Sequence, residues 1–277
     1  MTSSAEIRDR MRRDWGARRH EYATAAAQIN AAVADLLLGL VAPDPGDRVL
    51  DVATGPGVVA LRAARLTGPT GPVLATDIAP EWEEFVTGPS AAEGLPNVSF
   101  RAMGAEALDL PGASFDVAYC QFGLMFVPDR ARALGELRRV LRPGGRLGIA
   151  VWSTADRVPL FAPARMVAEV VPPSPDDANL PGPLALGEPG LIERLVAEAG
   201  FEHVAVERRI VERVVDDPDA YWQQMLNRND GQLAAALASR PADADHLHRR
   251  IVDFLEQHRD NNEIRLPSEV ILVGAMR

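Results

Sequence analysis

Short apolar runs alternate with amphipathic segments between residues 46 and 152. Runs that are apolar along their whole length are typical of parallel strands whose two faces are both covered. Such runs occupy residues 48–53, 73–77, 97–102, 115–120 and 146–152. Segments with helical character lie between them at 58–66, 80–93 and 129–141. This order predicts βαβ units and therefore an α/β fold with a doubly wound parallel sheet.

The sequence on either side of this region has a different pattern. Residues 5–40 predict one or two helices, and the proline-rich segment 156–190 predicts loops. A polar helical region, 216–262, separates two further predicted strands at 202–211 and 269–275. We interpret residues 1–277 as one domain whose core lies at 46–152 and whose N-terminal residues 1–42 form a helical cap. Segments 153–190 and 216–262 are covering insertions, and segments 191–215 and 263–277 complete the sheet.

Two local sequences predict interruptions of this pattern. Gly88-Pro89 predicts a break or bend in the helix at 80–93, because proline has no backbone N–H and its ring clashes with the preceding turn. The segment RPGG at 142–145 predicts a helix stop and a turn before the next strand, with no chemistry of its own.

Composition excludes some classes of function. The net charge of −10 disfavours a nucleic-acid-binding surface, because affinity for phosphates comes from basic residues. Cys120 is the only cysteine, which predicts a reducing, cytoplasmic location, and no signal-peptide pattern opens the chain. No apolar run reaches the ~18 residues of a spanning helix. The five histidines show no metal-like pairing, so we expect no metal site.

The best-defined motif is the glycine loop in RVLDVATGPGVVALRAA, residues 48–64. In one interpretation, Gly55 and Gly57 only permit the turn from strand to helix. In a second, GPGVVA is a dinucleotide-binding loop, with Asp77 as the acid that contacts the ribose. Two features count against the second: Asp51 would repel a pyrophosphate at the helix N-terminus, and the loop is longer than a dinucleotide turn needs.

The third interpretation is a pocket for S-adenosylmethionine (SAM). SAM has no phosphate and carries an ammonium and a sulfonium, so an acid such as Asp51 near the loop is favourable. Glycines let the backbone approach the methionine part closely, and Asp77 follows the second strand, where its carboxylate can accept bonds from both ribose hydroxyls. Open α/β sheets bind ligands at the carboxyl ends of their strands.

Four segments in order strengthen this third interpretation: VLDVATGPG, ATDIAPEW, AEALDLPGASFDVAYCQFGLMFVPD and ELRRVLRPGGRLGIAVW. Together, over about residues 46–152, they resemble the class I SAM-dependent methyltransferases, and most closely the ubiquinone/menaquinone-biosynthesis type (UbiE-like) and its natural-product relatives. The resemblance implies a Rossmann-like seven-stranded sheet whose last strand is antiparallel, a variable substrate-setting cap, SAM as cofactor and S-adenosylhomocysteine as product.

The resemblance also implies roles for single residues, in the order methionine part, ribose, adenine and sulfonium. Asp51, Ala53, Thr54, Gly55 and Gly57 would surround the methionine part, and Asp77 would hold the ribose. Ile78, Trp82, Ala105 and Glu106 would lie at the adenine, and Gln121 and Phe122 would lie near the sulfonium. The chain departs from the family pattern at MGAEAL, where Gly104 stands in place of the usual acid. Glu106 or backbone carbonyls are then the candidates to bind the adenine amine.

The acceptor of the methyl group is expected to be a small, largely apolar molecule, methylated on oxygen or carbon, such as a quinone or polyketide. The segment CQFGLMF lacks the Asn-Pro-Pro-aromatic sequence of amino-methylating DNA enzymes. Aromatic and apolar side chains of the covering segments are candidates to line a pocket, with core packing as the alternative: Trp15, Tyr22, Phe126, Trp152, Phe161, Tyr221, Trp222 and Met225. His20 is the candidate general base; an ionised acceptor would need none. An oligomer is possible.

Two other functions stay open. A member of the same fold can use bound SAM in a cyclisation without methyl transfer, and an NAD-type oxidoreductase is the third alternative. The mass of the product separates the first from a methyltransferase, and the identity of the bound cofactor separates the second.

Overall fold

The computed structural model describes residues 4–174 and 180–277, with the backbone alone at 228–230. Its internal contacts divide the chain into two compact units. Unit 1 consists of Met1–Ser153, Leu180–Arg209 and Val270–Arg277, and unit 2 consists of Thr154–Asn179 and Ile210–Glu269. The interpretation of the whole chain as one methyltransferase domain with covering insertions stays a prediction.

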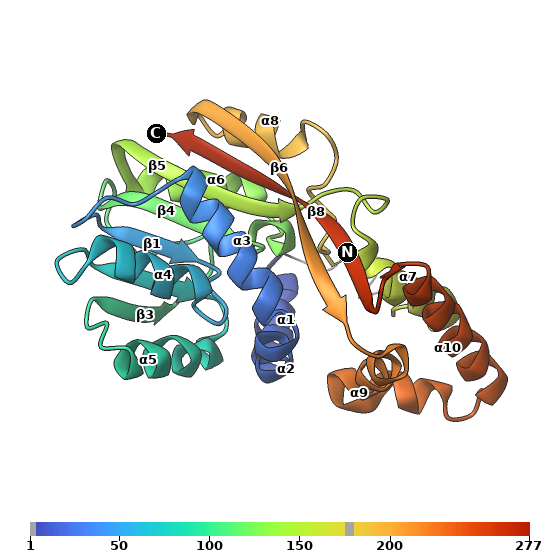
Figure 1. The fold of residues 1–277 in the computed structure, drawn as a ribbon. Helices are drawn as coiled ribbons and strands as arrows, with labels where there is room; N and C mark the ends of the chain where they lie inside the picture. Colours follow the sequence, from blue (N-terminus) through green and yellow to red (C-terminus); the bar gives the residue numbers. More distant parts are fainter. Residues whose placement is uncertain (1–3, 175–179) are drawn as a thin grey trace. The chain divides into compact units, whose positions relative to one another are not determined.

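The sheet has the predicted Rossmann-like architecture (Figure 1). Its strands are β3 (Val98–Ala102), β2 (Val73–Asp77), β1 (Val49–Val52), β4 (Phe115–Gln121), β5 (Leu141–Trp152), β8 (Glu263–Met276) and β6 (Glu202–Val215), in that order. The first five strands pair in parallel, and β8 pairs with β5 in antiparallel orientation. The predicted antiparallel last strand is therefore confirmed. A short additional strand, β7 (Arg259–Asp260), pairs with β8.

Helices precede, connect and follow the strands of unit 1. They are α1 (Ser4–Ala17), α2 (Arg19–Ala25), α3 (Ala27–Leu40), α4 (Val58–Thr67), η1 (Pro80–Trp82), α5 (Glu83–Ala92), η2 (Leu124–Phe126), α6 (Arg130–Val140) and α8 (Leu191–Glu198). The N-terminal region forms three helices, so the prediction of one or two was too low. The joints at Arg18 and Ala26 have ψ near 0°, which turns the chain without a glycine or proline signal.

The two predicted interruptions differ from the structure in detail. Helix α5 continues through Pro89 to Ala92, so the chain does not leave the helix at Gly88-Pro89. Pro89 lies in the last turn, where its missing N–H removes a single helical bond. Helix α6 ends at Val140 as expected, but RPGG lies inside β5 as an irregularity, because Phe115 pairs with Leu141 whereas Val117 already pairs with Arg146.

Burial shows why the central strands are apolar. All four residues of β1 are buried, and β5 is buried from Leu147 to Trp152, as expected for strands covered on both faces. Three strands are several residues longer than predicted: β5 begins at Leu141, β6 extends to Val215, and β8 begins at Glu263.

Unit 2 has a hydrophobic core of its own. It contains η3 (Pro159–Phe161), α7 (Ala162–Val170), α9 (Pro218–Leu237) and α10 (Pro241–Glu256). Tyr221, Trp222 and Met225 are each about 95% buried in this core together with Leu247 and Ile251. These three candidates for a pocket lining are thus core residues of unit 2.

Among the described residues, no single helix is long and apolar enough to cross a membrane; the bent pair α2 and α3 meets these criteria only when its two helices are taken together.

Candidate cofactor and substrate site

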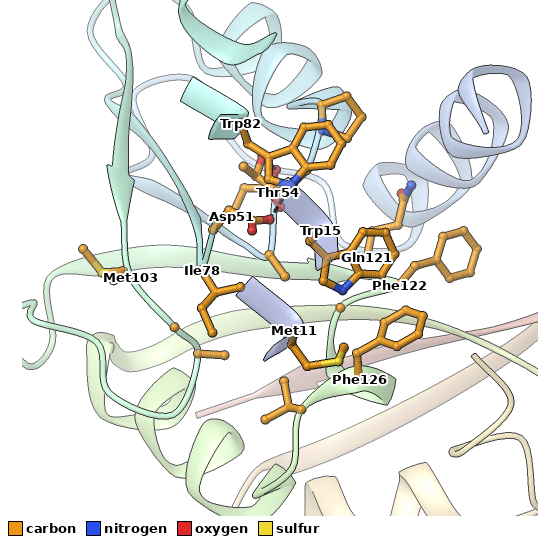
Figure 2. Close-up of a pocket in the computed structure, with 18 of the residues that line it drawn as sticks. Met11, Trp15, Asp51, Thr54, Ile78, Trp82, Met103, Gln121, Phe122 and Phe126 are labelled. Carbon is orange, nitrogen blue, oxygen red and sulfur yellow. Dashed lines mark hydrogen bonds between the residues drawn. The ribbon is translucent and has the colours of Figure 1, made fainter. Parts of the chain in front are cut away.

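One cavity of about 950 Å³, including its open mouth, lies at the carboxyl ends of β1, β2 and β4 in unit 1 (Figure 2). Its lining includes Asp51, Ala53, Thr54, Gly55, Asp77, Ile78, Trp82, Ala105, Glu106, Gln121 and Phe122. The structure thus brings together eleven of the twelve residues that the resemblance assigned to the cofactor.

Asp51 holds the loop after β1 to the start of α4. Its side chain is buried, and Oδ2 accepts hydrogen bonds from Thr54 Oγ1 at 2.6 Å and from the Ala60 backbone N–H at 3.1 Å. Burial raises the pKa of Asp51 to about 7, although these two hydrogen bonds favour the carboxylate. The ionised form is therefore costly unless a positive group enters the cavity.

The two glycines of the loop have different roles. Gly55 lines the cavity at φ +50°, and a Cβ added there would have no atom within 4 Å. Gly57 has φ +77° and is the one predicted cofactor residue outside the lining. A Cβ at Gly57 would lie 2.9 Å from Val86 Cγ2, so this glycine permits the close approach of α4 and α5.

Asp77 connects the end of β2 to the glycine loop. Its Oδ2 accepts a hydrogen bond from the Gly55 N–H and its Oδ1 from the Ala79 N–H, both at 3.0 Å. Burial is the main reason that the pKa of Asp77 is raised to about 6. A carboxylate has about four lone-pair sites, so both oxygens can still accept further donors.

Three amides of the loop and of the first turn of α4 already donate hydrogen bonds. The N–H of Gly55 donates to Asp77, that of Ala60 donates to Asp51, and that of Gly57 donates to the Thr54 carbonyl. The carboxyl groups of Asp51 and Asp77 beside the loop would, when ionised, repel a pyrophosphate. This geometry disfavours the dinucleotide interpretation.

Glu106 is buried and uses both of its carboxylate oxygens. Oε1 accepts from the Asp129 N–H at 3.0 Å, and Oε2 accepts from Arg8 Nη1 at 3.3 Å. The bond with Arg8 fastens α1 to the rim of the cavity. At Gly104, where the family has an acid, a Cβ would make only ordinary contact with Ile78 at 3.7 Å. The assignment of Glu106 or backbone carbonyls to the adenine amine stays a prediction.

Gln121 ends β4 and Phe122 follows it, at the side of the cavity that faces α3. Gln121 Nε2 donates to the Asn30 carbonyl at 3.0 Å, whereas Oε1 is buried without a partner. Phe122 has φ +55°, and its ring stacks on Trp152 with centres 4.5 Å apart. Trp152, a candidate for a pocket lining, thus supports Phe122 and is not itself in the lining.

The N-terminal helices supply the part of the lining that the sequence analysis identified least completely. Trp15 and Tyr22 were candidates and do line the cavity, as does Phe126 of η2. The residues missed are Arg8, Met11 and Asn30 of these helices and Pro56, Val58, Val59, Met103, Gly123, Val127 and Pro128 of the core. Arg8, Met11 and Trp15 are spaced by three and four residues, which places them on one helix face; this spacing was the available signal.

His20 lies outside the cavity. Its side chain is 69% exposed, and its Nε2 is 3.9 Å from Glu84 Oε1, with Phe85 beside the ring. The structure therefore does not place the candidate general base next to the site. Within residues 4–174 and 180–277, no group of three His, Cys, Asp or Glu side chains has the arrangement of a metal site.

Comparison with known proteins identifies the family. Residues 49–145 match a family described as a methyltransferase domain. An uncharacterized protein of Mycobacterium tuberculosis is 31% identical, with 86% of this chain and 85% of the relative aligned. The nocamycin O-methyltransferase of Saccharothrix syringae is 34% identical over 62% of this chain and 65% of its own length. The chain belongs to the class I SAM-dependent methyltransferases.

Solved structures support the fold of this methyltransferase. A putative methyltransferase from Bacillus halodurans has a TM-score of 0.59 at 20% identity, covering 88% of this chain and 97% of that chain. The cyclase SpnF has a TM-score of 0.52 at 24% identity, covering 88% of this chain and 80% of that chain. At these identities the likeness establishes the fold alone, which a methyltransferase and a cyclase share.

SAM is the cofactor of this methyltransferase, and the cavity suits it. The acids Asp51 and Asp77 line the cavity, which fits a ligand with positive groups and no phosphate. The open space at Gly55 leaves room for a ligand against the backbone.

Proposed function

We propose that this methyltransferase transfers the methyl group of SAM to a small, largely apolar acceptor, on oxygen or carbon, in the class of quinones and aromatic polyketides. One observation carries the proposal: a single cavity runs from buried acids at the strand ends to a wall of aromatic side chains. The first part suits a polar, positively charged cofactor, and the second suits an apolar acceptor.

The proposed contacts follow the sequence analysis and the positions in the cavity. Asp51, Ala53, Thr54 and Gly55 surround the methionine part, and Gly57 supports the loop from behind. Asp77 accepts hydrogen bonds from the ribose hydroxyls. Ile78, Trp82, Ala105 and Glu106 surround the adenine, and Gln121 and Phe122 lie near the sulfonium.

The chain has to align the acceptor and exclude water, since the bound cofactor supplies the electrophilic methyl group. The ionisable residues among the described lining are Arg8, Tyr22, Asp51, Asp77 and Glu106. Burial raises the pKa of Tyr22, which makes its hydroxyl a poor base at neutral pH. We therefore propose that proximity and orientation dominate, and that an acceptor hydroxyl loses its proton to solvent or binds already ionised.

Similarity to the nocamycin O-methyltransferase supports oxygen as the acceptor atom and a natural product as the acceptor class. Assignment to the ubiquinone/menaquinone branch stays a prediction, and so do the cytoplasmic location and an oligomer.

The experiment is to incubate the protein with SAM carrying a deuterated methyl group and a panel of hydroxyquinones and phenolic polyketides. Mass spectrometry should show the gain of one labelled methyl group and the formation of S-adenosylhomocysteine. Calorimetry in parallel should show binding of SAM and none of NADH. Binding of NADH without binding of SAM would overturn the proposal.

The cyclase alternative has its own signature in the same experiment. An acceptor that is converted at unchanged mass, with SAM required and not consumed, would replace methyl transfer by cyclisation. The shared fold with SpnF is the reason to include polyene substrates in the panel.

A further inference from the structure

Gln121, the last residue of β4, carries a hydrogen-bond acceptor that the described part of the protein leaves unused. Its Oε1 is buried and has no hydrogen-bond partner, although the Gln121 side chain belongs to the cavity lining. An acceptor that is shielded from water and left without a donor is costly, so most such groups are paired in native structures. The unpaired oxygen therefore points to a ligand that supplies the donor.

The orientation of the Gln121 amide is fixed by its other end. Nε2 donates to the backbone carbonyl of Asn30 in α3 at 3.0 Å, and a carbonyl oxygen can only accept. A flipped amide would place two oxygens against each other, so Oε1 is the atom that stays free. Its ligand must then be a hydrogen-bond donor, an O–H or an N–H group.

The backbone that carries this amide is fixed as well. Gln121 pairs with Ala150 of the neighbouring strand β5, and the N–H of Phe122 donates to the Ala150 carbonyl at 2.8 Å. A recognition group held by a central strand keeps its position more precisely than one on a loop. Gln121 thus presents a rigid acceptor to the cavity.

The surroundings of Gln121 belong to the helical side of the cavity. The Asn30 residue that holds its amide also accepts, through Oδ1, from Tyr22 Oη at 3.5 Å, and the Trp15 ring centre lies 5.2 Å from that of Tyr22. All three residues line the cavity. In the proposed function the ribose hydroxyls of the cofactor donate to Asp77, so Gln121 Oε1 remains for the acceptor of the methyl group.

We propose that Gln121 Oε1 accepts a hydrogen bond from a hydroxyl group of the methyl acceptor and thereby selects acceptors that carry one. The inference rests on the proposed function, which places the acceptor in this cavity beside the sulfonium. Because neighbouring side chains cover Oε1, the hydroxyl reaches it as these side chains shift, a change that is common on binding.

The chemistry of the amide narrows the substrate class. A neutral amide oxygen is a very weak base, so the hydroxyl that Gln121 holds keeps its proton, and the methyl group goes to another atom of the acceptor. The substrate is thus a largely apolar molecule that has a hydroxyl group in addition to the oxygen or carbon that is methylated. A site built to bind a hydroxyl discriminates strongly against analogues that lack it, since its polar group is then left unpaired.

The test uses two probes of nearly the same shape. 2-Naphthol donates a hydrogen bond, whereas 2-fluoronaphthalene does not. Equilibrium dialysis on the full chain loaded with S-adenosylhomocysteine gives the ratio of their dissociation constants. In Gln121→Met, which keeps the length of the side chain and removes the amide, the preference for 2-naphthol should fall about tenfold relative to the wild type, as expected for the loss of one neutral hydrogen bond. An unchanged ratio would overturn the proposal.

A second variant and a control keep the test decisive. Should Gln121→Met not fold, Gln121→Asn retains the amide but withdraws it by one methylene group, and the preference for 2-naphthol should fall in the same direction. Gln223→Met changes an exposed glutamine of α9 outside the lining and should leave the ratio unaltered. An equal change of the ratio in Gln223→Met and in the Gln121 variants would contradict the role of Gln121.

Calorimetry with S-adenosylhomocysteine separates the two ligands that can supply the donor. Its affinity should change by less than about threefold in Gln121→Met, because the hydrogen bond is made to the acceptor. A loss of cofactor affinity as large as the loss of 2-naphthol preference would show that Oε1 serves the cofactor, and would overturn the proposal.

The outcomes also separate this inference from the proposed function. Failure of both naphthalenes to bind the loaded wild type would contradict the small apolar acceptor of the proposed function, and this inference with it. Binding of both probes with the same ratio in the wild type and in Gln121→Met would contradict the role of Gln121 alone.

Discussion

The two walls of the cavity are built in different ways. The wall at the ends of β1, β2 and β4 uses backbone amides and buried acids, and Asp51 and Asp77 tie its loop in place. The wall from α1 and α2 uses side chains from surface helices, held to the core by contacts such as Arg8 with Glu106 and Arg19 with Glu84. The strand-end wall is fixed by the sheet, whereas the helical wall depends on a few side-chain contacts. We therefore expect substitutions in the strand-end wall to reduce SAM affinity more than substitutions in the helical wall.

The largest effect is expected at Gly55. Gly55→Val directs a side chain into open cavity space at φ +50°, so the fold should survive with a strain of about 1–2 kcal/mol while SAM affinity falls more than a hundredfold. Gly94→Val is the matched control, since Gly94 has φ +66°, equally open surroundings and no place in the lining. Calorimetry and thermal unfolding measure both. Normal SAM binding by Gly55→Val would show that the loop serves only as a turn between strand and helix.

The next effect concerns the pH dependence of stability without ligand. The folded-state pKa of Asp51 is raised to about 7 from 3.8, so the folded state holds a proton that the unfolded state has lost between these values. Asp51 alone should therefore lower the free energy of unfolding by about 1.4 kcal/mol per unit as pH rises from 5 towards 7, and Asp77, whose pKa is raised to about 6, should add to this slope below pH 6. Asp51→Asn should remove most of this slope, leaving the smaller contribution of Asp77. Denaturant unfolding of both proteins at pH 5, 6, 7 and 8 measures this dependence. Equal slopes of the free energy of unfolding against pH in the wild type and in Asp51→Asn would contradict a raised pKa of Asp51.

Loss of the Asp77 charge should weaken the binding of the cofactor. A charge-assisted hydrogen bond is worth roughly 1.5–3 kcal/mol, so Asp77→Asn should weaken SAM at least tenfold. Its side chain can still accept from the Gly55 or Ala79 N–H, which preserves the loop. Asp109→Asn, a change at an exposed acid outside the cavity, should leave the affinity unaltered. An unchanged SAM affinity in Asp77→Asn would contradict the assignment of Asp77 to the ribose.

A smaller effect is expected on the helical wall. Arg8→Gln removes an ion pair whose arginine is 36% exposed, and pairs of this kind contribute up to about 1 kcal/mol. SAM should bind less than about fivefold more weakly, mainly through faster dissociation measured by stopped flow. Arg13→Gln on the exposed side of α1 serves as control. A loss as large as that at Asp77 would show that the two walls are equally fixed.

The smallest effect is expected at His20. Its side chain is exposed and outside the lining, so His20→Ala should leave SAM affinity, turnover and the pH profile of turnover near those of the wild type. A hundredfold loss of turnover together with loss of the acidic limb of the profile would restore His20 as general base.

The sequence determined which segments form the core strands and the strand-end wall. Apolar runs identify buried strands because parallel strands covered on both faces cannot alternate, and residues that directly follow such strands must lie together at one edge. Asp51, Gly55 and Asp77 were therefore placed correctly in the cavity from the sequence alone. The antiparallel orientation of β8 came from the family resemblance and not from the local pattern.

Tertiary structure decided what local patterns leave open. The turns at Arg18 and Ala26, which carry no breaker residue, bring Trp15 and Tyr22 into the lining. The aromatic residues Trp15 and Trp222 look alike in sequence, yet one lines the cavity and the other packs in the core of unit 2. His20 has the chemistry of a base and the position of a surface residue. Amphipathic helices bury their apolar faces wherever a partner surface is available, and only long-range packing selects that partner.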